Sequence, residues 1–228
     1  SSAASDVYKR QALYTGKIDL SEAIAALLRS DRPDGLWATV VADEAGKALG
    51  LAWSDLDSLR EAVRSRTGVY RSRTRGLWRK GSTSGAGQEL LKIDLDCDRD
   101  ALRFTVRQKG AGFCHTERWT CFGEDRGISA LARKLEARAR SAPPGSYTRR
   151  LLSEPLLLAK KLVEEAEELG RAGTRTEALQ EAADLMYFTL VAMVRAGIRL
   201  ADVERELDLR SLRVTRRSGE ARQDEEGE

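Results

Sequence analysis

The chain has 228 residues, of which 41% are apolar, and its formal net charge is only +3. That apolar share is enough for one large core or two small ones, so wholesale disorder is excluded. Basic and acidic residues are interspersed, which argues against a nucleic-acid platform, and the longest strongly apolar run, residues 185–194, is too short to span a bilayer.

The first 33 residues are expected to lie outside the first domain. Asp6–Gln11 (DVYKRQ) match the in-frame translation of a common transposase sequencing adaptor, so we expect roughly the first eleven residues to be an artefact. A helix start at Asp19 and Glu22 follows, with apolar positions at helical spacing after it. Residues 12–28 resemble the closing helix of the barrel isomerase of histidine biosynthesis, so we expect this segment to be the remnant of an upstream helix.

Residues 34–124 are expected to form a β-rich domain. Val, Ile, Leu and Trp concentrate in short runs separated by Gly-containing turns. One helix is expected at residues 54–66, with Ser54 or Asp55 as its cap. The expected strands are residues 36–43, 47–54, 89–98 and 101–108.

Residues 125–228 are expected to be all-α. Apolar residues recur there at helical spacing, and Gly197 ends the third of four helical stretches. The fold class predicted is therefore α+β, with a β-rich domain followed by a helical one. The expected helices are residues 128–141, 154–172, 176–197 and 200–212.

Three cysteines, Cys97, Cys114 and Cys121, fall in one short segment of the β-rich domain. An odd number cannot complete a disulfide framework, and with no secretory signal visible we expect reduced thiols in a cytoplasmic protein. Three ligands suit a catalytic zinc, which keeps a fourth position for water. The alternative is three buried cysteines acting as small apolar residues. The single histidine, His115, directly follows Cys114.

Aspartates surround the first cysteine in the segment IDLDCDRDAL. If the segment is extended, Asp96, Asp98 and Asp100 share one face and Cys97 points to the other. Carboxylate oxygens suit magnesium, and three of them on one face repel unless a cation lies among them. The alternative is a solvated acidic turn.

A basic stretch precedes these ligands. Residues 70–88 place several arginines and Lys80 beside a loop rich in Gly, Ser and Thr, whose amides and hydroxyls suit phosphate oxygens. Any flexible basic loop has the same composition, so the signal is weak alone. The phosphate ligands expected here are Arg71, Arg73, Lys80 and Ser84.

Carboxylates also recur on two of the expected helices. Glu164, Glu165 and Glu168 share one side of the first helix, and Glu181 and Asp184 lie three residues apart on the next. Glutamate-rich helices are usually just solvated. Glu181 and Asp184, however, lie within an apolar stretch, so we expect them to be buried and, with the first three, to bind magnesium.

Residues 72–88, 94–116 and 120–122 resemble phosphoribosyl-AMP cyclohydrolase, an enzyme of histidine biosynthesis. The resemblance implies a zinc site in a homodimer, in which Cys97 of one subunit joins Cys114 and Cys121 of the other. It implies magnesium on the three aspartates and opening of the adenine ring between N1 and C6. His115 would either carry a proton or orient a ligand. Ser82 and Ala86 depart from the common bacterial pattern, which puts a catalytic role for either position in doubt.

The helical part resembles phosphoribosyl-ATP pyrophosphohydrolase, which is similar to the MazG-type pyrophosphohydrolases. Residues 143–152 and 181–191 carry the likeness, although Phe188 stands where many relatives have histidine. The five acidic residues would bind magnesium, with Glu165 as candidate base. Arg149, Lys161 and Arg210 would contact phosphate.

The function predicted is therefore two consecutive steps, pyrophosphate release from phosphoribosyl-ATP and ring opening of phosphoribosyl-AMP. Two other functions compete with it. One is a nucleotide pyrophosphatase with a degenerate zinc domain, and the other is a non-enzymatic, zinc-stabilised binding module. Retention of every matching ligand in both halves argues against both.

Overall fold

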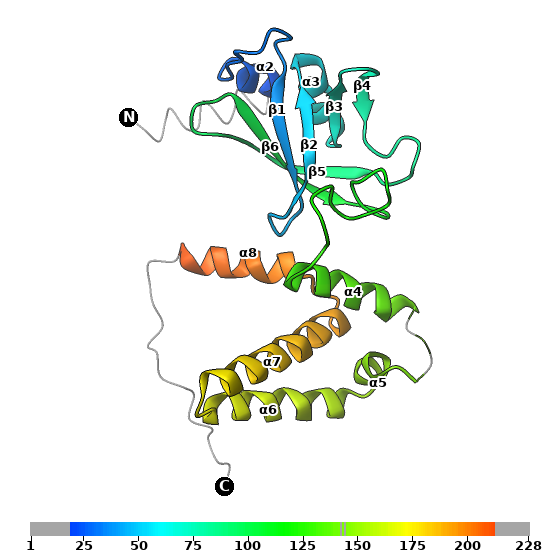
Figure 1. Cartoon of the computed structure of the whole chain (residues 1–228), viewed down its shortest axis with the longest axis vertical. Helices are drawn as coiled ribbons and strands as arrows, with labels where there is room; N and C mark the ends of the chain where they lie inside the picture. The colour runs from blue at the N-terminus through cyan, green and yellow to red at the C-terminus, as the bar shows by residue number, and fades with distance from the viewer. Residues whose placement is uncertain (1–18, 142, 144, 213–228) are drawn as a thin grey trace. The chain divides into compact units, whose positions relative to one another are not determined.

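The computed structural model describes residues 19–141, 143 and 145–212, and the chain divides into two compact units between Arg126 and Gly127. The first unit is strand-rich and the second is helical, which confirms the predicted α+β layout (Figure 1). The domain boundary expected between residues 124 and 125 lies two residues before this division. Among the helices of the described residues, none is long and apolar enough to cross a membrane.

A four-stranded sheet is the centre of the first unit. β1 (Trp37–Ala42) pairs antiparallel with β2 (Ala48–Ser54) and parallel with β6 (Ala101–Gln108). β5 (Gln88–Leu95) pairs antiparallel with β6, so the strand order is β2-β1-β6-β5. One face of the sheet packs into an apolar core. That core includes Val41, Leu49, Leu59, Val69, Tyr70, Leu102, Phe104 and Val106.

Two helices cover this core. α3 (Leu56–Ser65) begins at Asp55, whose carboxylate accepts a hydrogen bond from the backbone N–H of Ser58, so Asp55 rather than Ser54 is the cap. α2 (Leu20–Ala25) begins at Asp19 and packs against α3. Because Ile24, Ala25 and Leu28 pack against the core, a domain start at residue 34 leaves out a packed segment. The residues expected to be an artefact, 1–11, lie outside the described part of the chain.

A β-hairpin, which the sequence did not predict, occupies part of the basic stretch. β3 (Val69–Ser72) and β4 (Gly76–Arg79) pair antiparallel, and Gly76 has a φ of 74°. The arginines expected beside a loop therefore lie on or between two paired strands. A hairpin holds alternate arginines on fixed faces, whereas a loop does not.

A buried chain of hydrogen bonds fixes the rest of that stretch. The Tyr70 hydroxyl donates to Gln88 Oε1 (2.7 Å), and Gln88 Nε2 donates to Gln108 Oε1 (2.8 Å). Gln108 Nε2 in turn donates to the carbonyl of Ala86 (3.2 Å) and to that of Lys109 (2.7 Å). Burial raises the pKa of Tyr70, so its hydroxyl stays a donor. The network anchors residues 81–87 to the sheet.

The described residues of the second unit form five helices: α4 (Ile128–Ser141), α5 (Tyr147–Ser153), α6 (Pro155–Arg171), α7 (Arg175–Arg195) and α8 (Leu200–Ser211). Four of these were predicted, and α5 was not. α6 and α7 form a hairpin and lie side by side in Figure 1. Thr174 and Glu177 form a capping box that starts α7 directly after the turn. The core of this unit includes Leu135, Leu151, Leu158, Phe188, Leu190 and Val191.

Tyr70→Phe tests the buried network. The change leaves Gln88 Oε1 buried without its donor, and we expect it to lower the free energy of unfolding of the first unit by about 1–3 kcal/mol. Urea denaturation followed by tryptophan fluorescence measures this. Tyr147→Phe, which removes an exposed hydroxyl, is the control. A loss below about 0.5 kcal/mol, the scale of an ordinary surface substitution, would contradict the role given to the network.

Candidate active sites

Two of the three cysteines come together on one loop of the first unit. The backbone N–H of Phe113 donates to the carbonyl of Trp119 (3.1 Å), and that of Cys114 donates to the carbonyl of Arg118 (3.0 Å). This pairing folds the chain back on itself, so the sulfur atoms of Cys114 and Cys121 interact. Cys121 is held in turn by a hydrogen bond from its N–H to the carbonyl of Leu49 (2.8 Å) on β2.

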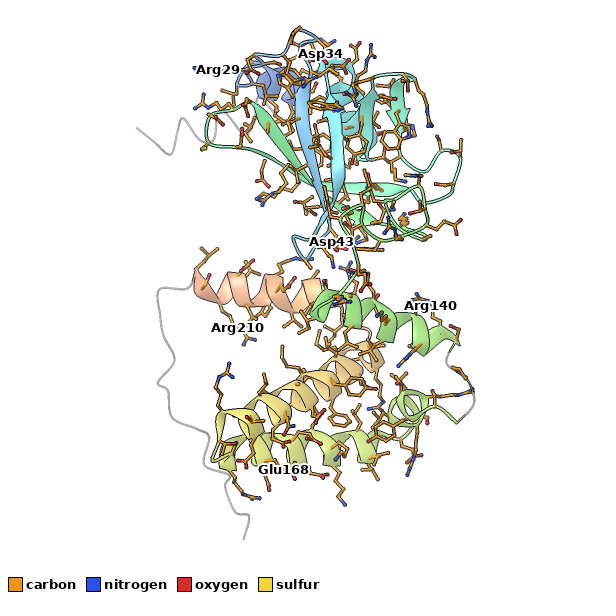
Figure 2. All side chains as sticks on the ribbon, viewed as in Figure 1. Arg29, Asp34, Asp43, Arg140, Glu168 and Arg210 are labelled. Carbon is orange, nitrogen blue, oxygen red and sulfur yellow. The ribbon has the colours of Figure 1, made fainter. Side chains whose placement is uncertain are left out.

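A close backbone approach makes this loop possible. A Cβ atom on Gly112 would lie 2.4 Å from the Cα of Trp119, and its φ is 130°. Trp119 also donates from Nε1 to Asp43 Oδ2 (2.9 Å), which ties the loop to the β1–β2 turn that Asp43 organises. Figure 2 labels Asp43 at that turn. Only glycine fits at residue 112 without moving the backbone that positions the thiols.

The two thiols differ in acidity. A hydrogen bond from the Thr116 hydroxyl, whose Oγ1 lies 3.1 Å from Sγ, is the main cause that lowers the pKa of Cys114 to about 6. Desolvation, together with the neighbouring Cys114 sulfur, raises the pKa of Cys121. One member of the pair is therefore a thiolate near neutral pH. Two adjacent sulfurs of this kind are soft donors that suit zinc.

Cys97 lies apart from this pair. It is exposed in the loop between β5 and β6. Among the described residues, the sulfur of Cys97 does not lie close enough to those of Cys114 and Cys121 for the three to bind one metal ion. One chain thus brings together two of the three predicted zinc ligands.

The three aspartates do gather, but not through a strand. β5 ends at Leu95, so the face alternation expected for an extended segment is wrong at residues 96–100. Instead, Asp96 Oδ1 accepts hydrogen bonds from the N–H groups of Asp100 and Ala101, both 3.0 Å long. One oxygen each of Asp96, Asp98 and Asp100 lies within 4.8 Å of the others, at the surface.

The acidities of these carboxylates reflect their crowding. Backbone hydrogen bonds lower the pKa of Asp96, whereas a hydrogen bond to Asp96 and the charge of Asp98 raise the pKa of Asp100. Like charges this close resist full ionisation. The three oxygen donors fit a hard cation such as magnesium.

The arginines of the β3–β4 hairpin line two adjoining pockets. The larger, of about 470 Å³, includes Asp34, Asp55, Arg71 and Arg73, and the smaller, of about 280 Å³, shares both arginines. Arg71 is held by Asp55, with Nε 3.1 Å from Oδ2. Trp53 and Trp78 line the smaller pocket, where the guanidinium of Arg73 lies 5.9 Å from the Trp53 ring. Guanidiniums beside indole faces suit a phosphorylated, planar ligand.

The other predicted residues of this unit lie near the loop of residues 112–121, here called the thiol loop, or near the loop of residues 81–87. His115 is exposed, with Nδ1 4.0 Å from the sulfur of Cys114. Ser82 and Ser84 are exposed, and Ser84 Oγ accepts from the N–H of Ala86 (3.3 Å). Ala86 is buried against Gly110, which accounts for a small residue there. Lys80, predicted as a phosphate ligand, is buried.

Three of the five predicted acidic ligands in the helical unit come together. One oxygen each of Glu165, Glu168 and Glu181 lies within 4.8 Å of the others, across the α6–α7 hairpin. Figure 2 labels Glu168 on α6. Glu164 and Asp184 are not members of this group. Asp184 is exposed, so the expected burial is wrong for it, whereas Glu181 is half-buried.

The charges at this cluster are strongly coupled. Lys161 Nζ lies 2.9 Å from Glu165 and 3.0 Å from Glu164, and these carboxylates raise the pKa of Lys161. Desolvation and the negative charges of Glu168 and Glu165 raise the pKa of Glu181. Glu165 is buried, and Lys161 is its cationic partner. A magnesium ion is a second cation that the three oxygens can accept.

Two other residues that were predicted to contact phosphate lie on other helices of the same unit. Arg149 is exposed on α5, and Arg210 pairs with Glu206 on α8 (2.9 Å). The phosphate contacts of Arg149 and Arg210 stay predictions.

Comparison with known proteins connects each unit to a family. Residues 50–123 match phosphoribosyl-AMP cyclohydrolase, and residues 128–211 match phosphoribosyl-ATP pyrophosphohydrolase. The histidine biosynthesis bifunctional protein HisIE of Gloeobacter violaceus is 37% identical over 198 residues, which cover 80% of this chain and 89% of that protein. The chain belongs to this bifunctional cyclohydrolase–pyrophosphohydrolase family.

Fungal histidine biosynthesis proteins are more similar to this chain in sequence than the bacterial protein is. The histidine biosynthesis trifunctional protein of Komagataella pastoris is 51% identical over 206 residues, which cover 90% of this chain and 24% of that protein. The bifunctional protein his7 of Schizosaccharomyces pombe is 49% identical over 206 residues, 90% of this chain and 49% of that protein. The chain thus spans about a quarter of the length of the trifunctional relative and half of the bifunctional one.

Several residues at these candidate sites were not expected from the sequence. Thr116 forms a hydrogen bond with the Cys114 sulfur. In the sequence, its position two residues after that cysteine is the feature that could have indicated this contact. Asp34 and Trp53 line the arginine pockets from segments distant in sequence, so no local motif could reveal them.

Thr116→Ala tests the electrostatics of the thiol pair in metal-free protein. Because the Thr116 hydroxyl is the main cause of the lowered pKa, the Cys114 alkylation rate should rise with pH around a midpoint near 6 in the parent chain. In the variant we expect the midpoint to move upward, toward that of an ordinary thiol. Iodoacetamide labelling read by peptide mass spectrometry measures this.

Thr116→Ser, which keeps the hydroxyl, is the matched control and should retain the low midpoint. Equal midpoints in the parent chain and Thr116→Ala would overturn the assignment.

Proposed function

We propose that the chain catalyses two consecutive hydrolytic steps of histidine biosynthesis. The helical unit converts phosphoribosyl-ATP and water to phosphoribosyl-AMP and pyrophosphate. The strand-rich unit then opens the adenine ring of phosphoribosyl-AMP. The observation that carries the proposal is that each matched family segment contains its own cluster of metal-type ligands, sulfur and oxygen in the first and oxygen alone in the second.

Ring opening needs a strong nucleophile at neutral pH. Zinc bound by Cys114 and Cys121 would supply it by lowering the pKa of a bound water. The third thiolate in this proposal is Cys97 of a second copy of the chain, which makes the functional unit a homodimer. Its exposure on the β5–β6 loop leaves Cys97 accessible to another chain.

The atoms balance as follows. The water oxygen bonds to C6 of the adenine ring, the N1–C6 bond breaks, and N1 takes up a proton. His115 lies beside a thiol ligand and is exposed, so its imidazole is placed to carry that proton. Magnesium on Asp96, Asp98 and Asp100 would add positive charge near a substrate that carries two phosphate groups.

We assign substrate binding in the first unit to the two pockets lined by Arg71 and Arg73. Arg71 is fixed by Asp55, and Arg73 is exposed beside the tryptophan ring, so guanidiniums and an aromatic face are offered together. A ribosyl phosphate joined to a purine has the matching charge and planarity. Ser84 adds an exposed hydroxyl on the neighbouring loop.

Pyrophosphate release is assigned to the α6–α7 hairpin. Magnesium held by Glu165, Glu168 and Glu181, with Glu164 and Asp184 as further ligands, would offset the charge of the α and β phosphates. Glu165 is the candidate base because it is buried next to a cation. Lys161 and Arg149 are the proposed phosphate contacts. The cytoplasmic location expected from the sequence stays a prediction.

Paired substitutions test the assignment of one activity to each unit. Cys114→Ser should lower ring opening by roughly a hundredfold or more while pyrophosphate release is retained. Glu165→Gln should do the reverse, because it removes one charge from the helical cluster only. Each activity is followed separately, with phosphoribosyl-AMP and phosphoribosyl-ATP as substrates.

Glu167→Gln is a matched control on α6, because Glu167 is exposed and pairs with Arg171. It should leave both rates unchanged. Loss of both activities in a folded Cys114→Ser or Glu165→Gln protein would refute the two-site assignment.

A further inference from the structure

Lys80 is a buried cation in the first unit. It directly follows β4, and only 9% of its surface is exposed. Among the described residues, no carboxylate forms an ion pair with it. Its ammonium lies instead 5.3 Å from the ring of Phe113 and 5.9 Å from the ring of Trp78. A buried ammonium needs compensation, and aromatic faces supply only part of it.

The backbone around Lys80 is fixed. Its N–H donates to the carbonyl of Gly68 (2.9 Å). The next residue, Gly81, is packed so tightly that a Cβ atom there would lie 2.3 Å from the nitrogen of Gly87. The side chain therefore leaves a rigid point, and its ammonium lies beside the rings of Phe113 and Trp78, which pack edge-on against each other.

The thiol pair is the negative charge that faces Lys80. Phe113, whose ring contacts the ammonium, directly precedes Cys114 in the loop. Burial lowers the pKa of Lys80, and the charges of Cys121 and Cys114 oppose this effect. Phe113 is itself seated against Gly50, where a Cβ atom would lie 2.2 Å from the ring. Strand β2 thus supports both Phe113 and, through Leu49, Cys121.

We propose that Lys80 is a positioning residue that balances the negative charge of the Cys114–Cys121 pair, and that it is not a ligand of the substrate phosphate. The charge change on metal loading gives the reason. Three cysteines that bind Zn²⁺ as thiolates form a site of net charge −1, which a fixed cation nearby stabilises. This inference rests on the zinc site of the proposed function.

Lys80→Met in the full chain tests the proposal. Methionine keeps an apolar stem beside the two rings and removes the charge, so the metal-free protein should fold with an unchanged or raised Tm. Zinc affinity, measured at pH 7 by competition with a chromophoric chelator, should fall roughly tenfold or more. The KM for phosphoribosyl-AMP of the zinc-saturated variant should stay unchanged.

Lys92→Met is the matched control, because Lys92 is an exposed lysine on β5 of the same unit and should leave zinc affinity unchanged. Unchanged zinc affinity with a raised KM in Lys80→Met would overturn the proposal and make Lys80 a phosphate ligand. Lys80→Gln is the second variant, and loss of folded structure in both would also overturn it, because the role would then be structural.

Zinc affinity is measured without turnover. A parent chain that binds zinc but opens no ring would therefore refute the proposed function, whereas the effect of Lys80→Met on zinc binding would still decide the role of Lys80.

Discussion

Anionic side chains held within a few ångströms of one another repel, and this chain gathers them at three places. Three aspartates crowd the β5–β6 loop, three glutamates face one another across the α6–α7 hairpin, and two sulfurs meet on the thiol loop. A hydrogen bond with Asp96 and the charge of Asp98 raise the pKa of Asp100, as expected for crowded carboxylates. A fold accepts such crowding when cations compensate it, and the character of the donors favours magnesium on the oxygens and zinc on the sulfurs.

The two units hold their ligands by different means. In the helical unit the carboxylates project from rigid helices, and Lys161 already supplies one cation. In the strand-rich unit the ligands lie on loops, so their precision depends on supports outside the loops. Gly112 permits the close approach of the thiol loop to itself, and the Tyr70–Gln88–Gln108 network anchors the neighbouring loop to the sheet. The two family-matched segments therefore position their clustered side chains in different ways.

Much of this could be predicted from the sequence, because periodicity and caps are local signals. The strand Ala101–Gln108 and the helix Ile128–Ser141 were predicted at their observed bounds. The β3–β4 hairpin was missed because its arginines and hydroxyl residues give it the composition of a loop. The strand that ends at Leu95 was predicted too long. The aspartates after it have the alternating spacing of a strand, but the Asp96 carboxylate accepts a hydrogen bond from the backbone N–H of Asp100 and so ends the strand.

Properties that depend on tertiary packing could not be predicted in this way. Lys80 lies in a basic stretch, and nothing local to it signals burial beside the rings of Phe113 and Trp78. Asp184 has the spacing of a ligand on the face of Glu181, yet it is exposed and lies outside the cluster. The proposed role of Cys97 involves a second chain, about which the fold of one chain carries no information.

Product analysis tests the central claim most directly. Chelator-treated protein is incubated with phosphoribosyl-ATP and magnesium, with and without added zinc, and the products are separated by chromatography. We predict phosphoribosyl-AMP and pyrophosphate without zinc, and the ring-opened product only when zinc is present. Failure to consume phosphoribosyl-ATP with magnesium, or ring opening that does not respond to zinc, would contradict the account.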